Sequence, residues 1–188
     1  MRFAAICLAL VGLSAPAMAQ TVAERLPTCL SCHGAQGISD TPGIPSLAGQ
    51  PADYLLVQLV LFRDKQRVSE VMNAMADGLS DDDLRGLADS MAKLAPPKAS
   101  GPVLEAAVLD QGRGLVEKYR CGSCHAANLS GQEQIPRLAA QREDYLGKQL
   151  TDYKSNARAG YDPAMNEVAQ EVQPADIPVL AKYIANLR

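Results

Sequence analysis

Apolar and polar positions follow helical spacing along much of this chain, and one arrangement occurs twice. In residues 53–65 apolar side chains recur three and four positions apart, which predicts a helix with one buried face. Residues 144–154 carry the same pattern. Ser80 followed by three aspartates is typical of a helix start, and apolar residues follow at helical spacing as far as Leu94. Because almost no stretch alternates with the period of a strand, the pattern predicts an all-α protein.

The remaining helices differ between the two halves of the sequence. Residues 173–187 predict a second capped helix, in which Pro174 suits a first turn, whereas Pro178 lies deeper, so the helix is expected to begin late or to bend. Residues 103–119 predict a long helix. Its counterpart, residues 21–26, is shorter, and Pro27 follows it directly. We therefore expect weaker packing of this first helix in its half.

These elements belong to an internal repeat with a shift of about 92 residues. The matched segments are Pro45–Gln50 with Pro136–Gln141, Asp53–Leu55 with Asp144–Leu146, Gln58 with Gln149, Arg67 with Arg158, Met72-Asn73 with Met165-Asn166, and Asp83 with Asp176. A period of this length exceeds that of solenoid repeats and indicates a duplicated small domain. Residues 96–102, rich in proline, have the composition of a linker. The sequence thus predicts one domain over residues 20–95 and another over residues 103–188.

Each copy carries one Cys-x-x-Cys-His pentapeptide. The two are Cys29-Leu-Ser-Cys32-His33 and Cys121-Gly-Ser-Cys124-His125. This is the attachment signature of c-type haem, in which both thiols bond to the porphyrin and the adjacent histidine binds the iron. A thioredoxin-like site would need a βαβ context, and paired zinc motifs usually lie ~15–20 residues apart, whereas 89 positions separate Cys32 from Cys121. The sequence therefore predicts two covalently bound haem c groups.

The second axial iron ligand has to be a residue other than histidine, because both histidines belong to the pentapeptides. Methionine is the next common choice and raises the reduction potential. Met165 is the only candidate in the second half, while Met72, Met75 and Met91 compete in the first. Met72 and Met165 each precede their matched aspartate by 11 positions, Met91 fits the apolar face of a helix, and Met75 is compatible with ordinary packing. The repeat therefore favours Met72 and Met165.

The start of the chain has the features of an export signal. Arg2 precedes an apolar run over residues 3–13, and Ala17-Met-Ala19 forms a cleavage site, so residues 1–19 are predicted to be a signal peptide cleaved after Ala19. The apolar run is too short to span a bilayer. Since haem c is attached outside the cytoplasm, the expected location is the periplasm.

Charge and composition narrow the possibilities further. The net charge is −3 and no long run of one sign occurs, so nothing suggests a nucleic-acid partner. Aromatic residues make up 4% of the chain, and tryptophan is absent. Two buried porphyrins would supply the missing apolar volume, so we expect the chain to need its cofactors to fold.

The ordered set of motifs resembles the dihaem cytochrome c4 family over essentially the whole mature chain. The resemblance implies two class-I cytochrome c domains in tandem, each a small helical bundle around a covalent haem c. It implies iron ligation by His33 and Met72 in the first domain, and by His125 and Met165 in the second.

The resemblance also implies a role for two prolines. The carbonyl oxygens of Pro45 and Pro136 would accept hydrogen bonds from Nδ1–H of His33 and His125, which fixes the ring orientation and the basicity of the ligand. Four other residues matched by the repeat, Tyr54, Tyr145, Arg67 and Arg158, suit haem propionates or a domain interface, and equally suit ordinary helix surfaces.

Six-coordinate iron leaves no position for a substrate, so we expect an electron-transfer protein rather than an enzyme. The expected function is outer-sphere electron transfer in the periplasm between a respiratory donor and a terminal oxidase or reductase. An alternative is the dihaem subunit of a periplasmic dehydrogenase such as flavocytochrome c sulfide dehydrogenase. A dihaem peroxidase or gas-binding protein would need an open iron, which the paired methionines argue against. The expected partners are redox proteins (a membrane cytochrome complex, a terminal oxidase or a periplasmic dehydrogenase), through which any membrane association would arise.

Overall fold

The computed structural model describes residues 21–158 and 163–187, which form helices joined by loops and contain no strand. The predicted signal peptide and its cleavage site lie outside the described residues. The helices are α1 Val22–His33, α2 Ala52–Arg63, α3 Glu70–Ala76, α4 Asp81–Ala92, α5 Ala106–Lys118, α6 Cys121–His125, α7 Glu143–Lys154, α8 Ala164–Glu171 and α9 Asp176–Ala185. The prediction of an all-α fold is confirmed. No described helix has the length and apolar content needed to cross a membrane.

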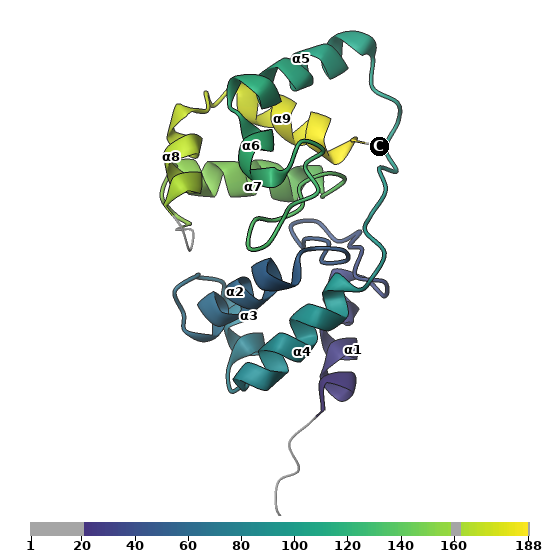
Figure 1. Cartoon of the computed structure of the whole chain (residues 1–188), viewed down its shortest axis with the longest axis vertical. Helices are drawn as coiled ribbons and strands as arrows, with labels where there is room; N and C mark the ends of the chain where they lie inside the picture. Colours follow the sequence, from purple (N-terminus) through teal and green to yellow (C-terminus); the bar gives the residue numbers. More distant parts are fainter. Residues whose placement is uncertain (1–20, 159–162, 188) are drawn as a thin grey trace, which may run out of the picture.

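The helices form two groups, α1–α4 and α5–α9, stacked one above the other and joined by an extended segment at the side (Figure 1). Every contacting pair of described helices lies within one group, and α2·α4 and α7·α9 are equivalent pairs in the two groups. We call residues 21–95 the first half and residues 103–187 the second half. The contacts between the halves therefore come mainly from loops and helix ends.

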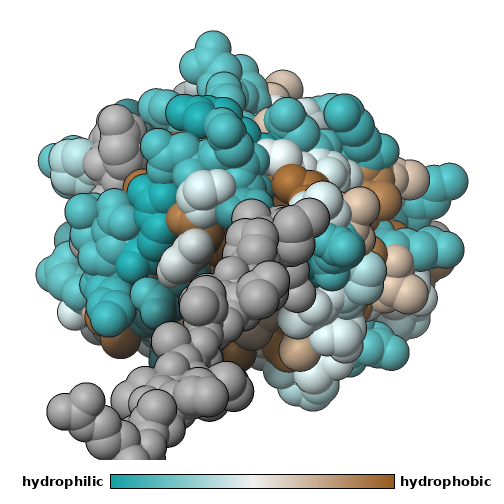
Figure 2. Space-filling model, turned by 90° about the horizontal axis from the view of Figure 1, so that it is seen from below, coloured by the Kyte–Doolittle hydropathy of each residue, from teal (hydrophilic) through white to brown (hydrophobic). Residues whose placement is uncertain are grey.

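The second half contains one continuous hydrophobic core, whereas the core of the first half is divided. Among the described residues of the second half, ten that are buried form a single cluster, to which α9 contributes Ile177, Leu180 and Ile184. In the first half, one cluster surrounds Phe62 and Leu84 and another surrounds Met91. Figure 2 shows one end of the molecule, where polar residues dominate and hydrophobic ones are scattered.

Helix α4 forms as the capping signal predicts. The Ser80 side chain accepts a hydrogen bond from the Asp83 N–H, and the Asp83 carboxylate accepts one from the Ser80 N–H, which satisfies two donors that a helix start leaves without partners. In the second half, α9 begins at Asp176, so Pro178 occupies its first turn, where a missing N–H costs no helical bond. The expectation that this helix begins late is confirmed.

The first helix is longer than predicted, and this expectation was wrong. Helix α1 runs without interruption from Val22 to His33, with Pro27 inside it. Thr21 and Glu24 form a reciprocal cap at its start, which stabilises the turn that precedes the proline. The interruption occurs instead in the second half, where Arg120 adopts a left-handed conformation, with φ of 53°, between α5 and α6.

Each half ties the start of its last helix to the helix that leads into the pentapeptide. In the first half Arg25 of α1 lies 3.4 Å from the Asp83 carboxylate. In the second half the Tyr119 hydroxyl donates to Asp176 at 2.6 Å, and Lys118 contributes an ion pair at 3.1 Å. These hydrogen bonds, the one from Tyr119 first, hold the pKa of Asp176 below its ordinary value.

Replacing Tyr119 with phenylalanine is expected to raise the pKa of Asp176 and to destabilise the second half near neutral pH. A carboxylate with a lowered folded-state pKa contributes stability above its unfolded-state pKa and loses it as the pH falls through the folded-state value. The difference in thermal midpoint between wild type and variant should therefore shrink in acid. Carboxyl NMR titration and thermal unfolding at neutral and acidic pH measure both effects, and an unchanged Asp176 pKa would contradict this account.

Candidate haem-binding sites

The first pentapeptide forms the end of α1, whereas the second forms the separate short helix α6, but the cysteines of the two are half-buried and exposed in the same order. Cys29 and Cys121 are half-buried, and burial raises the pKa of both thiols, whereas Cys32 and Cys124 are exposed. The four cysteines in the described part of the chain are free thiols. Each site thus offers one half-buried and one exposed sulfur to which a haem could bond.

The histidine of each pentapeptide is buried and fixed by one backbone carbonyl. His33 Nδ1 lies 2.8 Å from the Pro45 oxygen, and His125 Nδ1 lies 2.8 Å from the Pro136 oxygen. A carbonyl only accepts, so Nδ1 carries the proton and Nε2 keeps its lone pair for a metal. Burial lowers the pKa of both imidazoles and outweighs the opposing effect of the carbonyls. Both rings are therefore held neutral, as iron ligation requires.

The three methionines of the first half occupy distinct environments. Met91 is 4% exposed and belongs to the hydrophobic core on α4, whereas Met75 on α3 is 42% exposed. Met72, also on α3, is half-buried against the core cluster that contains Phe62. Met165 is half-buried on α8, the counterpart of α3. The matched methionines therefore share a half-buried position on equivalent helices.

Sequence reasoning did not assign a role to the asparagines that follow these methionines. The Asn73 side chain donates to the carbonyl oxygens of Phe62 and Arg67, at 2.6 and 2.9 Å. The Asn166 side chain donates to the carbonyl oxygen of Arg158 at 2.8 Å. Both contacts fasten the methionine helix to the end of the preceding helix and its loop. The repeat of Met-Asn in both halves of the sequence was the one feature that could have predicted this role.

Two arginines matched by the repeat meet between the halves. Arg67 donates to Gln58 of its own half at 2.7 Å, and to Tyr145 and Gln149 of the other half at 3.0 and 3.1 Å. Arg158 donates to Gln149 of its own half, and to Gln58 of the other half at 3.0 Å. These residues therefore lie at the interface between the halves, one of the two places that their pattern suggested.

This arginine cluster has positive charge in excess. Arg158 is 7% exposed and its Nε has no hydrogen-bond partner. Among the described residues, no carboxylate forms an ion pair with Arg67 or Arg158. The partners of both arginines are side-chain amides, a tyrosine hydroxyl and aromatic rings rather than carboxylates, so the cluster keeps its positive charge and suits an anionic group such as a haem propionate.

A cleft of about 1060 Å³ lies elsewhere, along residues 97–101 of the connecting segment. Its other walls come from residues 34–40, Ser46, residues 140–142, α7 and α9. None of the candidate cysteines, histidines or methionines lines this cleft. It is therefore separate from the residues that would hold haem.

Comparison with known proteins agrees with the fold and the pentapeptides. The cytochrome c family model matches residues 109–188. Cytochrome c4 of Pseudomonas aeruginosa is 32% identical over 87% of this chain and 85% of that protein. The thiosulfate dehydrogenase electron acceptor of Thiomonas intermedia is 33% identical over 92% of this chain and 84% of that protein.

A solved structure supports the same relationship in three dimensions. Reduced recombinant cytochrome c4 from Pseudomonas stutzeri superposes with a TM-score of 0.79 at 30% identity, covering 90% of this chain and 100% of that one. The tandem class-I cytochrome c fold predicted from the sequence is thereby confirmed, as are two haem c groups. The chain belongs to the cytochrome c4 family of dihaem electron-transfer cytochromes.

Proposed function

We propose that this protein is a periplasmic electron carrier that works between a respiratory donor and a terminal oxidase or reductase. The observation that carries the proposal is the paired site geometry: each half holds a neutral, buried histidine with Nε2 free, next to a Cys-x-x-Cys pair. Family membership supports electron transfer, and the N-terminal sequence with its Ala17-Met-Ala19 site supports export.

In the proposed sites the thiols of Cys29 and Cys32 bond to haem 1, and those of Cys121 and Cys124 bond to haem 2. His33 and Met72 bind the first iron, and His125 and Met165 bind the second. Support for Met72 over its two competitors comes from its half-buried position on α3 and from its match to Met165. The domain division at residues 96–102 is part of the same proposal, and the grouping of helix contacts supports it.

The haem supplies a one-electron iron couple when bound, and the residues of the chain set its surroundings. Pro45 and Pro136 hold the histidine rings in one orientation and increase their basicity. The thioethers of Met72 and Met165 would hold the iron together with the histidines, which would leave no position for a substrate and would suit the sites to electron transfer. Arg67 and Arg158 would form ion pairs with haem propionates, and the Arg158 Nε, which has no hydrogen-bond partner, would be available for such a contact.

A second candidate function is service as the electron-accepting partner of a periplasmic dehydrogenase. The relative from Thiomonas intermedia, named as the electron acceptor of thiosulfate dehydrogenase, favours it. Exposed apolar side chains also lie on α3 and just before it, with Val68 at 86%, Val71 at 67% and Met75 at 42% exposed. Copurification of a catalytic subunit with the exported chain would favour this function over that of a free carrier.

The ligand assignment predicts the absorption spectrum. The oxidised, haem-loaded protein is expected to show two equivalents of the far-red band that arises from Met–iron charge transfer, one for each haem. The reduced protein is expected not to bind carbon monoxide, because both axial positions are filled. Absorption spectroscopy of the holoprotein, quantified per haem, makes the measurement. A single equivalent of the band together with carbon monoxide binding would exclude a pure carrier and bring forward a catalytic open site.

A further inference from the structure

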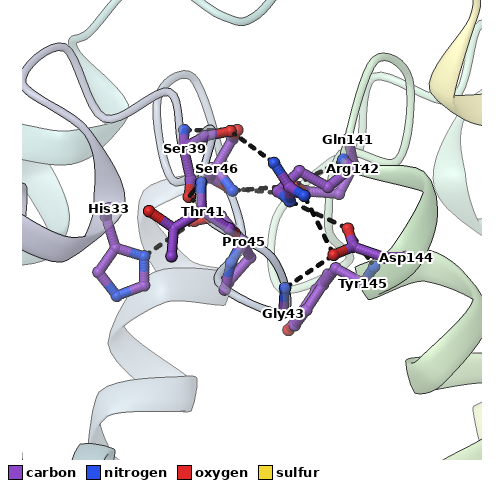
Figure 3. A network of polar contacts seen from close by, with 10 residues as sticks. All are labelled: His33, Ser39, Thr41, Gly43, Pro45, Ser46, Gln141, Arg142, Asp144 and Tyr145. Carbon is purple, nitrogen blue, oxygen red and sulfur yellow. Dashed lines mark hydrogen bonds and ion pairs between the residues drawn. The ribbon is translucent and has the colours of Figure 1, made fainter.

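Two glutamines form a reciprocal pair of contacts across the interface between the halves. Gln141 of the second half accepts a hydrogen bond from the Ser46 N–H and donates one to the Ser46 carbonyl oxygen, both at 2.8 Å (Figure 3). Gln50 of the first half accepts from the Arg137 N–H at 3.0 Å and donates to the Arg137 carbonyl oxygen at 2.9 Å. Both glutamine side chains are 5% exposed. The two contacts thus clamp equivalent backbone positions in opposite halves.

The clamped backbone is the peptide unit that also holds the histidine. The amide N–H of Ser46 belongs to the same planar peptide as the carbonyl of Pro45, and that carbonyl oxygen lies 2.8 Å from His33 Nδ1. One rigid peptide therefore receives the bond from His33 at its oxygen and gives a bond to Gln141 at its nitrogen. Figure 3 shows His33 and Gln141 on opposite sides of this segment.

The second half contains the same chain of bonds in the opposite direction. The carbonyl of Pro136 and the N–H of Arg137 form one peptide unit, which is bonded to His125 at its oxygen and to Gln50 at its nitrogen. Each histidine is thus connected through a single peptide to a glutamine of the other half.

The two bonds on one peptide strengthen each other. Donation from the N–H draws electron density through the conjugated amide towards the oxygen, so the carbonyl becomes a better acceptor. A stronger bond to Nδ1–H makes the imidazole a more basic iron ligand, which favours oxidised iron. Removing the glutamine would therefore weaken the histidine bond and raise the reduction potential of that haem.

We propose that Gln141 is a positioning residue for the haem 1 ligand His33, and that Gln50 is one for the haem 2 ligand His125, so that each half adjusts the reduction potential of the haem in the other. This inference rests on the proposed ligation by the two histidines. It also assigns a function to the docked arrangement of the halves: separating them removes the glutamine from each histidine peptide and raises both potentials.

Other contacts between the halves provide a matched control. The Asp144 carboxylate accepts from the Gly43 N–H at 2.7 Å, and Arg142 donates to the Ser39 carbonyl oxygen at 3.4 Å. Neither contact involves the peptide that bonds His33. Asp144→Ala therefore loosens the same interface while leaving the hydrogen bonds of Gln141 with Ser46 and of Gln50 with Arg137 in place.

The test uses the holoprotein with Gln141→Leu, Gln50→Leu and Asp144→Ala. In the reduced protein, NMR signals of the two histidine Nδ1–H protons are assigned through their contacts with Pro45 and Pro136. Gln141→Leu is expected to speed hydrogen exchange at His33, by less than the roughly tenfold that complete loss of one ordinary hydrogen bond would give, and to leave His125 unchanged. The potential of haem 1 should rise. Gln50→Leu should produce the same changes at His125 and haem 2. Asp144→Ala should change neither the histidine exchange rates nor the two reduction potentials.

Gln141→Met provides a second measurement if the leucine variant does not accumulate. Its unbranched side chain has about the length of glutamine but can neither accept from the Ser46 N–H nor donate to the Ser46 carbonyl oxygen, so His33 exchange should again be faster and the haem 1 potential higher. Effects confined to the haem of the substituted half, or equal at both haems, would overturn the inference. Absence of a haem-shifted His33 Nδ1–H signal in the wild type would instead overturn the ligation proposal itself.

Discussion

Met72→Ala is expected to remove half of the far-red Met–iron band and to open one iron to carbon monoxide. The thioether is a weak ligand that stabilises reduced iron, so its loss leaves water or no ligand at that position and lowers the reduction potential of haem 1. Met72 is half-buried on α3 against the core cluster that contains Phe62, and the hydrogen bonds of Asn73 fasten this helix to the end of α2. Haem 2 should keep its band, its potential and its resistance to carbon monoxide.

The other two methionines of the first half serve as controls. Met75→Ala changes an exposed side chain on the same helix and should leave the spectrum unchanged. Met91→Ala removes a 4% exposed core side chain and should cost about 2–5 kcal/mol of stability, again with both bands intact. If Met75→Ala or Met91→Ala lost half of the band while Met72→Ala kept it, the haem 1 ligand would be that methionine and not Met72. Met165→Ala should reproduce the Met72→Ala result at haem 2.

Local signals predicted most of the fold because they act within a few residues. The Ser80 cap and the helical spacing after it predicted α4, and the repeat transferred that prediction to α9. The first helix shows the limit of such reasoning: Pro27 suggested an end, yet the cap formed by Thr21 and Glu24 and the packing of α1 on α4 carry the helix through it. A proline removes one backbone donor, and neighbouring contacts outweigh that loss here.

The sequence could not predict what lies between the halves. The repeat matched Gln50 with Gln141 and Arg67 with Arg158, but it contains no information on how two copies are oriented. Only the docked structure shows that each glutamine reaches across to the peptide beside a histidine, and that the arginines converge. Reciprocal contacts of this kind follow from a near-twofold arrangement, because one favourable contact between equivalent surfaces then occurs twice.

The joint replacement of Cys29 and Cys32 by alanine is expected to have the largest structural effect. The chain should carry one haem in place of two, and the first half should lose its folded structure. A domain of this size buries a small share of its surface and is marginally stable without a cofactor. The core of the first half is divided into two clusters, and Cys29 packs against both of them, so a haem attached there would join them.

The equivalent replacement of Cys121 and Cys124 is the matched comparison, and it should be less damaging. Ten buried residues form one continuous cluster in the second half, so part of its packing is independent of the haem. Mass spectrometry counts the attached haems, and far-UV circular dichroism follows the helices. The Cys29/Cys32 variant should lose about half of the helical signal, because α1–α4 contain about half of the described helical residues. Full helicity with an unchanged thermal midpoint in the Cys29/Cys32 variant would show that the first half folds without its cofactor. Its two core clusters would then be enough to stabilise the fold.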